Sequence, residues 1–438
     1  MDHYPYAGKS IQETQSVGIP MHLQSLHDGQ SAYRIIGYNT LIFFVLLPGI
    51  RAIFKYLPEY AWLVVIAEAL AVIFVANSGG KWNKKLFGNA YLLTLLLMLA
   101  TLALYMMYPV ADGLKAVMRG SDQDDCVVLG ALRLLAGQNP YLDLTYFGNP
   151  CSTGFGVLLY YLPFVLFNAY FLGGIFSIVV VMAALLRSTG RLEDAGFFFF
   201  LLFSCVAVPE LLVVGSDLIF VGSGIALLVL LVRPLADSKQ WGMLFLSALL
   251  CGVLASSRVN FLVLVPLIAF LLFSRWRSGA FLFVVFGAII AFLPSLLIYL
   301  SDPQAFTPLH LLHKAQVIMP RGILIVAALV SVGMAIVGYF MVRRSAQALP
   351  LAVFLSLLPG LLTLSLGDLY GRGWNPALWE GANYLIPLLP IAALLVVEQR
   401  KSAGIPSHGS DPKDTIRPQE QLLSGDHALN GMTRHNTG

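Results

Sequence analysis

Charged side chains are scarce in this chain of 438 residues, and their scarcity excludes several classes of protein. Asp, Glu, Lys and Arg make up 11% of the sequence, whereas an ordinary soluble protein carries about 25%. This deficit excludes a soluble enzyme of the usual kind, a nucleic-acid-binding protein and a disordered scaffold. The net charge of +4 is no argument for nucleic acid, because in a membrane protein it mostly reflects the side on which Lys and Arg lie.

Cysteine is also scarce, and its spacing excludes one common kind of site. The chain has 4 Cys and no Cys-x-x-Cys pair, so we expect no structural zinc site. Cys205 and Cys251 lie in apolar runs, where a free Cys behaves as a small buried apolar residue. Cys126 and Cys151 share one polar segment and could form a disulfide in an oxidising compartment. The sequence leaves this pairing open because it contains no Cβ geometry.

Apolar residues are abundant instead, at 58% of the chain. They recur in runs, and a membrane-crossing helix needs about 20 such residues. We therefore predict an all-α, polytopic transmembrane bundle of about twelve spans. The predicted spans are 35–54, 60–79, 88–110, 155–186, 195–210, 217–232, 241–257, 260–273, 280–300, 322–342, 348–367 and 383–398.

Polar segments flank the predicted bundle, which comprises residues 35–398. Residues 1–34 and 399–438 lack apolar periodicity, and we predict loose cytoplasmic tails without a cleaved signal peptide. Run 155–186 contains Pro163 and could be one kinked helix or two short ones. With this run counted as one span, the positive-inside rule places both tails in the cytoplasm. We expect an integral, multi-pass protein of a bacterial plasma (inner) membrane.

The longest connection within the bundle, residues 111–154, carries a cluster of carboxylates on the predicted outer face. Asp122, Asp124 and Asp125 precede apolar residues that recur at helical spacing, which predicts a short amphipathic helix at the interface. The carboxylates could simply favour the start of this helix. They could also act as a general base or hold a divalent cation.

Cationic and polar side chains on the same face form a second group of candidates. They could contact a phosphate or a sugar, or they could anchor helix ends at the interface. Arg258 lies at a helix end between two apolar runs, where an ionisable group is a functional candidate, and Asp217 or Glu210 could pair with it. His310 and His313 could instead bind a metal, although only two ligands are visible. The candidate substrate-binding residues are Asp217, Arg258, His310, His313, Lys314, Arg321 and Arg372.

Together these motifs resemble the GT-C class of integral membrane glycosyltransferases. A membrane helix is followed by an Asp-containing outer loop, an amphipathic helix and the sequence Gly-Gln-Asn-Pro-Tyr at 137–141. Gly215–Asp217 at the start of a span, Ala255–Arg258 at the end of another and Tyr384 with two following prolines are similar to further elements of the class. The resemblance covers residues 88–398.

This resemblance implies an activity, substrates and roles for site residues. GT-C enzymes transfer a sugar from a polyprenyl-phosphate-linked donor to a lipid or glycan acceptor, here on the outer face. The implied partners are this donor, this acceptor and membrane lipid, with no nucleic acid. An Asp of the first large outer loop activates the acceptor hydroxyl, so Asp122 is the first candidate base, followed by Asp124 or Asp125. A divalent cation, Mg²⁺ or Mn²⁺, is compatible with these carboxylates, and metal dependence stays open.

Two other functions stay open. A transporter or lipid-glycan flippase often shows internal repeats and ionisable groups at mid-membrane. Here no repeat is evident and the charges lie mostly at one face, with Glu68 inside run 60–79 as an exception. The second alternative is a non-catalytic membrane partner in an envelope complex. Sugar transfer by detergent-solubilised protein would separate an enzyme from a transporter, because transport requires a sealed compartment.

Overall fold

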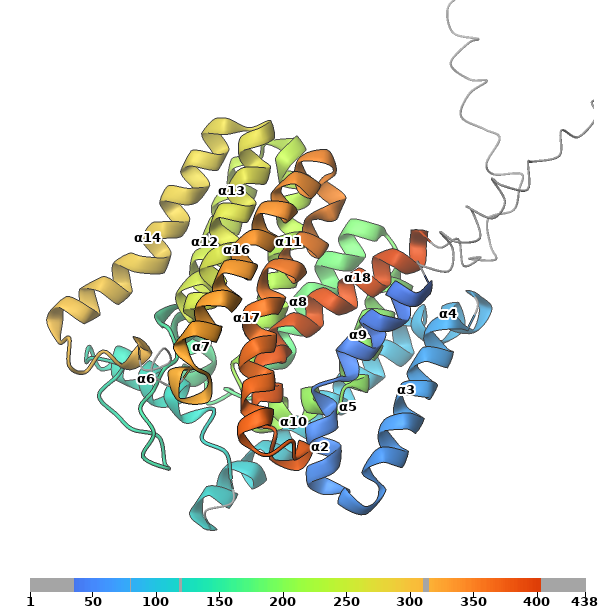
Figure 1. The fold of residues 1–438 in the computed structure, drawn as a ribbon, viewed down its shortest axis with the longest axis horizontal. Helices are drawn as coiled ribbons and strands as arrows, with labels where there is room; N and C mark the ends of the chain where they lie inside the picture. The colour runs from blue at the N-terminus through green and yellow to red at the C-terminus, as the bar shows by residue number, and fades with distance from the viewer. Residues whose placement is uncertain (1–34, 79, 118–119, 310–314, 403–438) are drawn as a thin grey trace, which may run out of the picture.

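The computed structural model describes residues 35–78, 80–117, 120–309 and 315–402, and these residues form a bundle of helices (Figure 1). The chain begins with the helical segment Ile35–Leu46. The α-helices that follow are α2 (Gly49–Tyr56), α3 (Ala61–Asn77), α4 (Gly80–Phe87), α5 (Ala90–Gly113), α6 (Asp125–Leu135), α7 (Phe155–Leu166), α8 (Leu172–Thr189), α9 (Leu192–Ser204), α10 (Ala207–Val213), α11 (Leu218–Ser238), α12 (Trp241–Ser257), α13 (Leu264–Arg275), α14 (Arg277–Ser301), α16 (Arg321–Arg344), α17 (Leu349–Gly371) and α18 (Leu389–Ser402).

Short 3-10 helices connect or extend several of these elements. They are η1 (Pro58–Tyr60), η2 (Leu114–Val117), η3 (Val259–Val263), η4 (Thr307–Leu309), η5 (Ala346–Ala348), η6 (Pro376–Leu378) and η7 (Glu380–Leu388). The described part of the chain contains no β-strand, only an isolated bridge between Leu144 and Pro150. The predicted all-α class is therefore confirmed.

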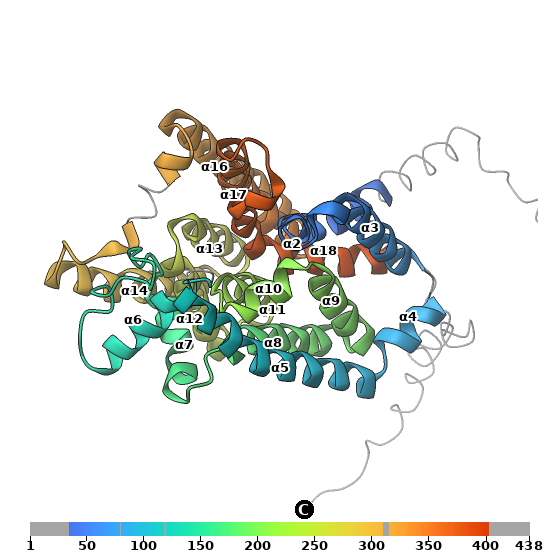
Figure 2. The same cartoon turned by 90° about the horizontal axis from the view of Figure 1, so that it is seen from below.

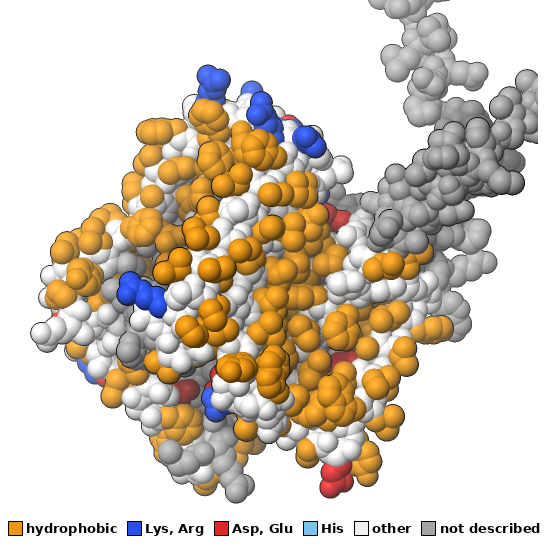
Figure 3. Space-filling view, viewed as in Figure 1, with side chains coloured by type: hydrophobic (Ala, Val, Ile, Leu, Met, Phe, Trp, Pro, Cys, Tyr) orange, Lys and Arg blue, Asp and Glu red, His pale blue; other side chains and the backbone are white. Residues whose placement is uncertain are grey.

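Burial divides the helices into a core and a periphery. In the most apolar stretch of η7 and α18, 83% of the residues are buried, and the figure for α11 is 72%. The corresponding share is 6% for the helix formed by α5 and η2 and 11% for α16. Seen from below, α10 and α11 lie near the centre, while α3, α5, α14 and α16 lie around them (Figure 2). Apolar side chains cover the visible outer face (Figure 3), as expected for helices that face lipid.

Helix length and composition allow eight to ten membrane spans in the described residues, fewer than the predicted twelve. Eight helices are long and apolar enough to cross a membrane, and up to ten if two bent helix pairs each count as one span. The shorter apolar helices are α7, α12 and the η3–α13 segment Val259–Arg275. The structure thus supports a membrane-embedded helical bundle, and the predicted total of about twelve spans stays a prediction.

Run 155–186 is two helices rather than one long kinked helix. The chain leaves the helical conformation between α7 and α8, and only α8 has the length of a span. The start of α7 lies against the end of α12, where the Gly154 amide donates to the Ser257 carbonyl oxygen at 3.3 Å. Gly190, with φ +67°, ends α8 in the left-handed conformation that glycine adopts without strain. The run therefore contributes one span-length helix.

The bundle has two ends, which differ in the elements and the charged side chains that lie there. The helical segment Ile35–Leu46 begins and α18 ends at what we call the tail end, which lies toward the upper right of Figure 1. The opposite loop end carries α6, α7 and α10. Lys and Arg side chains gather at the top of Figure 3, and Arg343 and Arg344 end α16.

Two bent helix pairs cross near the loop end. The segment Ile35–Leu46 and α2 meet at 47°, and α9 and α10 meet at 81°. A Cβ added at Gly49 would lie only 3.2 Å from the backbone nitrogen of Val206, so the two breaks pack directly against each other. The bend turns α10 across the loop end, beneath α11 and beside the residues that form the candidate site.

Candidate functional site

Asp124 is the buried centre of the candidate site. It occupies the position before α6, and only 3% of its surface is exposed. Its Oδ1 accepts a hydrogen bond from Lys115 Nζ at 2.8 Å, and its Oδ2 accepts one from the Tyr108 hydroxyl at 2.7 Å. Tyr108 belongs to α5 and Lys115 to η2, so the end of a span-length helix holds the residue that precedes the short helix α6.

Lys115 contacts two further carboxylates. Its Nζ lies 2.6 Å from Asp112 Oδ1 and 2.5 Å from Asp125 Oδ1. One oxygen from each of Asp112, Asp124 and Asp125 lies within 4.8 Å of the others, which is a spacing suited to a divalent cation. The ammonium group already contacts all three carboxylates, so a cation at this place would compete with Lys115. Whether Lys115 or a divalent cation contacts the three carboxylates, the cluster carries more negative than positive charge.

The pKa of Asp124 is raised above the ordinary value for an aspartate. Burial is the main cause, because it disfavours the charged carboxylate. The hydrogen bonds from Lys115 and Tyr108 oppose this effect, and the charge of Asp125 adds to it. An ionised Asp124 is consequently a stronger base than an exposed aspartate, which is the property that proton abstraction requires.

Asp122, the first candidate in the sequence, supports the loop instead. Its Oδ2 accepts hydrogen bonds from the Thr145 hydroxyl at 2.6 Å and from Asn149 Nδ2 at 2.9 Å. Asp125 also binds the loop, because its Oδ2 accepts a hydrogen bond from the Tyr146 amide at 2.7 Å. The geometry therefore favours Asp124 over Asp122 as the candidate base.

A disulfide fixes the start of α6 to the segment before α7. Cys126 and Cys151 are paired, with 25 residues of sequence separation. The Cys151 carbonyl oxygen also accepts a hydrogen bond from the Thr307 hydroxyl, which connects this segment to η4. Cys205 and Cys251 are free and buried, as predicted. The pairing that the sequence left open thus holds Asp124 and Asp125 next to a covalent crosslink.

Asp217 and Arg258 form a second buried pair. Asp217 precedes α11 and is 5% exposed, and its Oδ2 lies 3.2 Å from an Arg258 guanidinium nitrogen at the end of α12. Arg258 Nε is buried and has no hydrogen-bond partner among the described residues. Of the two partners that the sequence leaves open for Arg258, Asp217 is the observed one, and Arg258 retains a donor for a further ligand.

The two pairs lie on either side of the Gly215–Ser216 turn. Gly215 has φ +69°, and a Cβ there would lie 2.9 Å from Asp124 Cβ. The Tyr170 hydroxyl donates to the Gly215 carbonyl oxygen at 2.7 Å. Burial raises the pKa of Tyr170, and the charges of Asp217 and Asp124 both raise it further. Tyr170 therefore lies close to both carboxylates, and only glycine fits the turn between them.

The remaining sequence candidates lie apart from Asp124 or outside the described chain. Arg372 is part-exposed and pairs with Asp368 at 3.6 Å and Glu380 at 3.4 Å. Arg321 begins α16, is exposed and makes no ion pair with the described residues. His310, His313 and Lys314 lie outside the described residues. The structure brings together the loop carboxylates and, across the turn, Asp217 and Arg258.

Sequence reasoning missed several polar residues of this region. Tyr108 and Lys115 were not singled out, although a Lys just after a span and just before an Asp cluster was an available signal. Glu210 of α10, which the sequence suggested as another partner for Arg258, instead contacts three side chains of α2: Arg51 at 3.2 Å, Lys55 at 3.3 Å and the Tyr56 hydroxyl at 3.1 Å. Arg51 Nε is buried without a hydrogen-bond partner among the described residues. Arg51 and Lys55 thus share the single carboxylate of Glu210.

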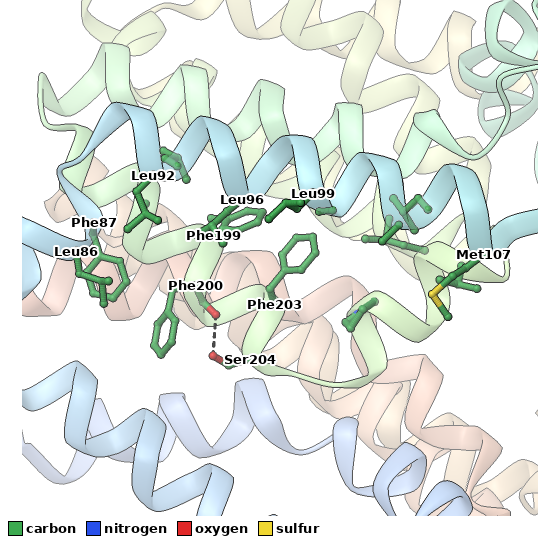
Figure 4. Close-up of a pocket in the computed structure, with 18 residues that line it drawn as sticks. Leu86, Phe87, Leu92, Leu96, Leu99, Met107, Phe199, Phe200, Phe203 and Ser204 are labelled. Atoms are coloured by element: carbon green, nitrogen blue, oxygen red, sulfur yellow. Dashed lines mark hydrogen bonds between the residues drawn. The ribbon is translucent and has the colours of Figure 1, made fainter.

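An apolar cavity of about 620 Å³ runs along α5 (Figure 4). Its walls are side chains of α5 on one side and of α9 and α10 on the other, and Leu86 and Phe87 of α4 lie at one end of the row. Met107 lies at the other end, directly before Tyr108 in the sequence. The cavity therefore extends from the end of α4 to Met107, near the end of α5.

Comparisons of the chain with protein-family models, with curated proteins and with solved structures found no match.

Proposed function

We propose that the chain is a membrane glycosyltransferase of the GT-C type. It moves a sugar from a polyprenyl-phosphate-linked donor to a lipid or glycan acceptor at the loop end, which faces the outside of a bacterial plasma membrane, and both termini lie in the cytoplasm. One observation carries the proposal. An apolar cavity is lined at one end by Met107, the residue before Tyr108, and Tyr108 binds a buried carboxylate whose pKa is raised. A lipid tail in that cavity would bring its headgroup to Asp124.

Asp124 acts as the general base in this proposal. The acceptor hydroxyl oxygen attacks the anomeric carbon, the bond from that carbon to the phosphate oxygen breaks, and the hydroxyl proton passes to an Asp124 oxygen. Each carboxylate oxygen has two lone pairs, so an oxygen that accepts one hydrogen bond can still accept a proton. Polyprenyl phosphate leaves as an anion, and the attack inverts the configuration at the anomeric carbon.

The leaving phosphate requires positive charge that the Asp124 cluster does not supply. Lys115 faces three carboxylates, so its charge is already compensated. Arg258 faces one carboxylate, and Arg51 and Lys55 share another. These three cations are the best phosphate partners among the described residues. A Mg²⁺ or Mn²⁺ ion held by the loop carboxylates would supply further positive charge, provided that Lys115 moves.

A transporter or flippase is the second candidate, and one observation favours it. The two bent helix pairs pack together at Gly49 and Val206, and discontinuous helices of this kind often form transport sites. Glu68 lies near the middle of α3 and makes no hydrogen bond or ion pair with the described residues. A carboxyl at this depth is a functional candidate by default. The polar residues at the loop end have no evident use in this alternative.

The decisive test is sugar transfer by purified protein in detergent. Asp124→Asn should lower kcat by about 10²–10⁴-fold, which is the usual contribution of a general base. Asp122→Asn is the matched control, because an amide oxygen can still accept from Thr145, and we expect most activity to remain. Full activity of Asp124→Asn would refute the assignment of the base. Sugar movement that appears only across sealed liposomes would instead support transport.

A further inference from the structure

We propose that an aromatic corner formed by Tyr370 and Trp374 binds a sugar unit of a glycan. The corner lies at the loop end, where the connection from α17 to η7 packs against α2 through η6 (Figure 1). Binding of the sugar is independent of the proposed function. The role of the glycan as acceptor rests on that function, which leaves a lipid and a glycan open, and the corner favours the glycan.

Trp374 has a backbone conformation that the end of α17 does not require. Gly373, with φ +66°, already ends the helix in the left-handed region, and the Trp374 amide donates to the Leu369 carbonyl oxygen at 2.9 Å. Trp374 then adopts φ +59° itself. This region is unfavourable for a bulky residue, and such conformations gather at sites that bind ligands. The strain therefore points to a role for the indole ring beyond the end of the helix.

The connection that carries Trp374 is fixed to α17. The buried Trp379 indole donates to the Ser365 carbonyl oxygen at 2.8 Å, and the Gly381 amide donates to Asp368 Oδ2 at 2.6 Å. Both acceptors belong to α17. A ring held on such a support loses little conformational freedom when a ligand binds, which favours binding.

The two rings of the corner are exposed and stand at a steep angle to each other. The exposed fraction is 67% for Tyr370 and 61% for Trp374. Their ring centroids lie 6.2 Å apart, and the angle between the ring planes is 80°. A pyranose ring has a face of C–H groups that can pack on the flat face of an aromatic ring. One ring of the corner can therefore stack on a sugar while the other borders its edge.

Charged side chains beside the corner offer hydrogen bonds to hydroxyl groups. Arg372 lies between the two aromatic residues in the sequence, and its guanidinium nitrogens are 3.4 Å from Glu380 Oε2 and 3.6 Å from Asp368 Oδ1. A strong charge-assisted hydrogen bond measures about 2.7–2.9 Å, so Arg372 and Glu380 keep capacity for a ligand. Sugar hydroxyls can accept from the guanidinium and donate to the carboxylate. A saccharide matches this combination because it has both C–H faces and hydroxyl groups.

Trp62 provides the contrast within the same protein. It is 62% exposed near the start of α3, and its ring centroid lies 5.0 Å from that of Phe54. Its backbone is helical, because anchoring at a membrane interface requires an amphipathic ring and no special backbone conformation. Trp62 is therefore the matched control for Trp374, with the same exposure and without the strain.

The test measures the binding of soluble oligosaccharides to the full chain in a detergent without a sugar headgroup. Maltohexaose, cellohexaose, mannohexaose and chitohexaose are titrated separately, and saturation-transfer NMR records which ligand protons contact the protein. At least one of these probes should bind, with the strongest saturation at ring C–H protons. Glycerol, which has hydroxyl groups but no ring, should not bind. A lack of binding by all four probes would overturn the proposal.

Two substitutions of Trp374 separate the ring from the backbone. Trp374→Ala should weaken binding of the oligosaccharide by about tenfold, because the stacking face is lost. Trp374→Gly should weaken it equally but unfold at a higher temperature than Trp374→Ala, because glycine adopts this φ without strain. Trp62→Ala should leave the affinity unchanged. Wild-type affinity in Trp374→Ala, or an equal loss in Trp62→Ala, would overturn the proposal, and the second result would indicate that both rings only anchor the protein in lipid.

Binding and transfer can fail separately. Oligosaccharide binding that depends on Trp374, in a protein that never transfers sugar, supports the aromatic corner and contradicts the glycosyltransferase. Transfer to a lipid acceptor without any oligosaccharide binding supports the glycosyltransferase and contradicts the corner. A rise in KM for a glycan acceptor in Trp374→Ala, with kcat retained, would support both.

Discussion

Two buried ion-paired groups flank the Gly215–Ser216 turn, and carboxylates outnumber cations at only one of them. On one side, a single ammonium group, that of Lys115, faces three carboxylates. On the other side, Arg258 faces Asp217 alone and keeps a buried Nε without a partner among the described residues. A place rich in carboxylates can take up a proton, and a place with spare guanidinium donors can hold an anion. Under the proposed function, this difference suits Asp124 to proton transfer and Arg258 to phosphate contact.

Removal of Lys115 should have the largest effect. Lys115→Met leaves three carboxylates close together without a cation, and loss of one partner from a buried ion pair typically costs about 3–5 kcal/mol. We expect a clear drop in the thermal unfolding temperature in detergent, together with loss of transfer. Lys85→Met, at an exposed residue of α4, is the control and should change little. An unchanged unfolding temperature for Lys115→Met would mean that the cluster is more hydrated than its burial indicates.

The disulfide should affect the Asp124 side more than the Arg258 side. A crosslink that closes a loop of this length stabilises a protein by about 3 kcal/mol. In the double variant Cys126→Ser/Cys151→Ser, we therefore expect lower stability and a larger fall in kcat than rise in donor KM. Reduction of the wild-type protein with a thiol should reproduce this pattern. A change confined to donor KM would show that the disulfide supports the phosphate contacts instead.

Arg258→Lys tests the phosphate side without removing the charge. Lysine keeps the pairing with Asp217 but lacks the planar fork of donors that binds phosphate. Loss of one hydrogen bond to a charged group should raise donor KM by about tenfold, with a smaller effect on kcat and on stability. Steady-state kinetics with varied donor provide the measurement. If donor KM is unchanged while kcat falls, Arg258 serves the chemistry and not the binding of donor.

The smallest expected effect is a shift in pH dependence. Asp124 accepts a proton only when ionised, so transfer should fall as the pH drops through its pKa, and burial places that pKa above the ordinary value of about 3.9. The Tyr108 hydrogen bond lowers this pKa. Tyr108→Phe removes that bond, and the acidic limb of kcat/KM should move to higher pH. Tyr105→Phe, at an exposed position of the same helix, is the control and should leave the acidic limb of kcat/KM in place. A shift of this limb toward lower pH in Tyr108→Phe would contradict Asp124 as the base.

Helix positions could be predicted where apolar runs were long and bounded by polar residues. Run 88–110 corresponds to α5, and the amphipathic pattern after Asp125 corresponds to α6. Run 155–186 was harder, because apolar composition continues through the turn that separates α7 from α8. The bend between α9 and α10 was likewise invisible in the sequence. Lipid accepts apolar side chains on any backbone, so composition alone does not locate a break.

The sequence by itself determined that this protein is a helical membrane protein and that its loop carboxylates are the residues of interest, because both conclusions follow from the transfer of side chains between water and hydrocarbon. Only the tertiary structure distinguished Asp124 from Asp122. Both are aspartates in one short loop, and their difference arises from residues that the fold brings to them, Tyr108 and Lys115 to one and Thr145 and Asn149 to the other. The proton affinity of a carboxylate depends on its burial and its neighbours, and these exist only in the folded chain.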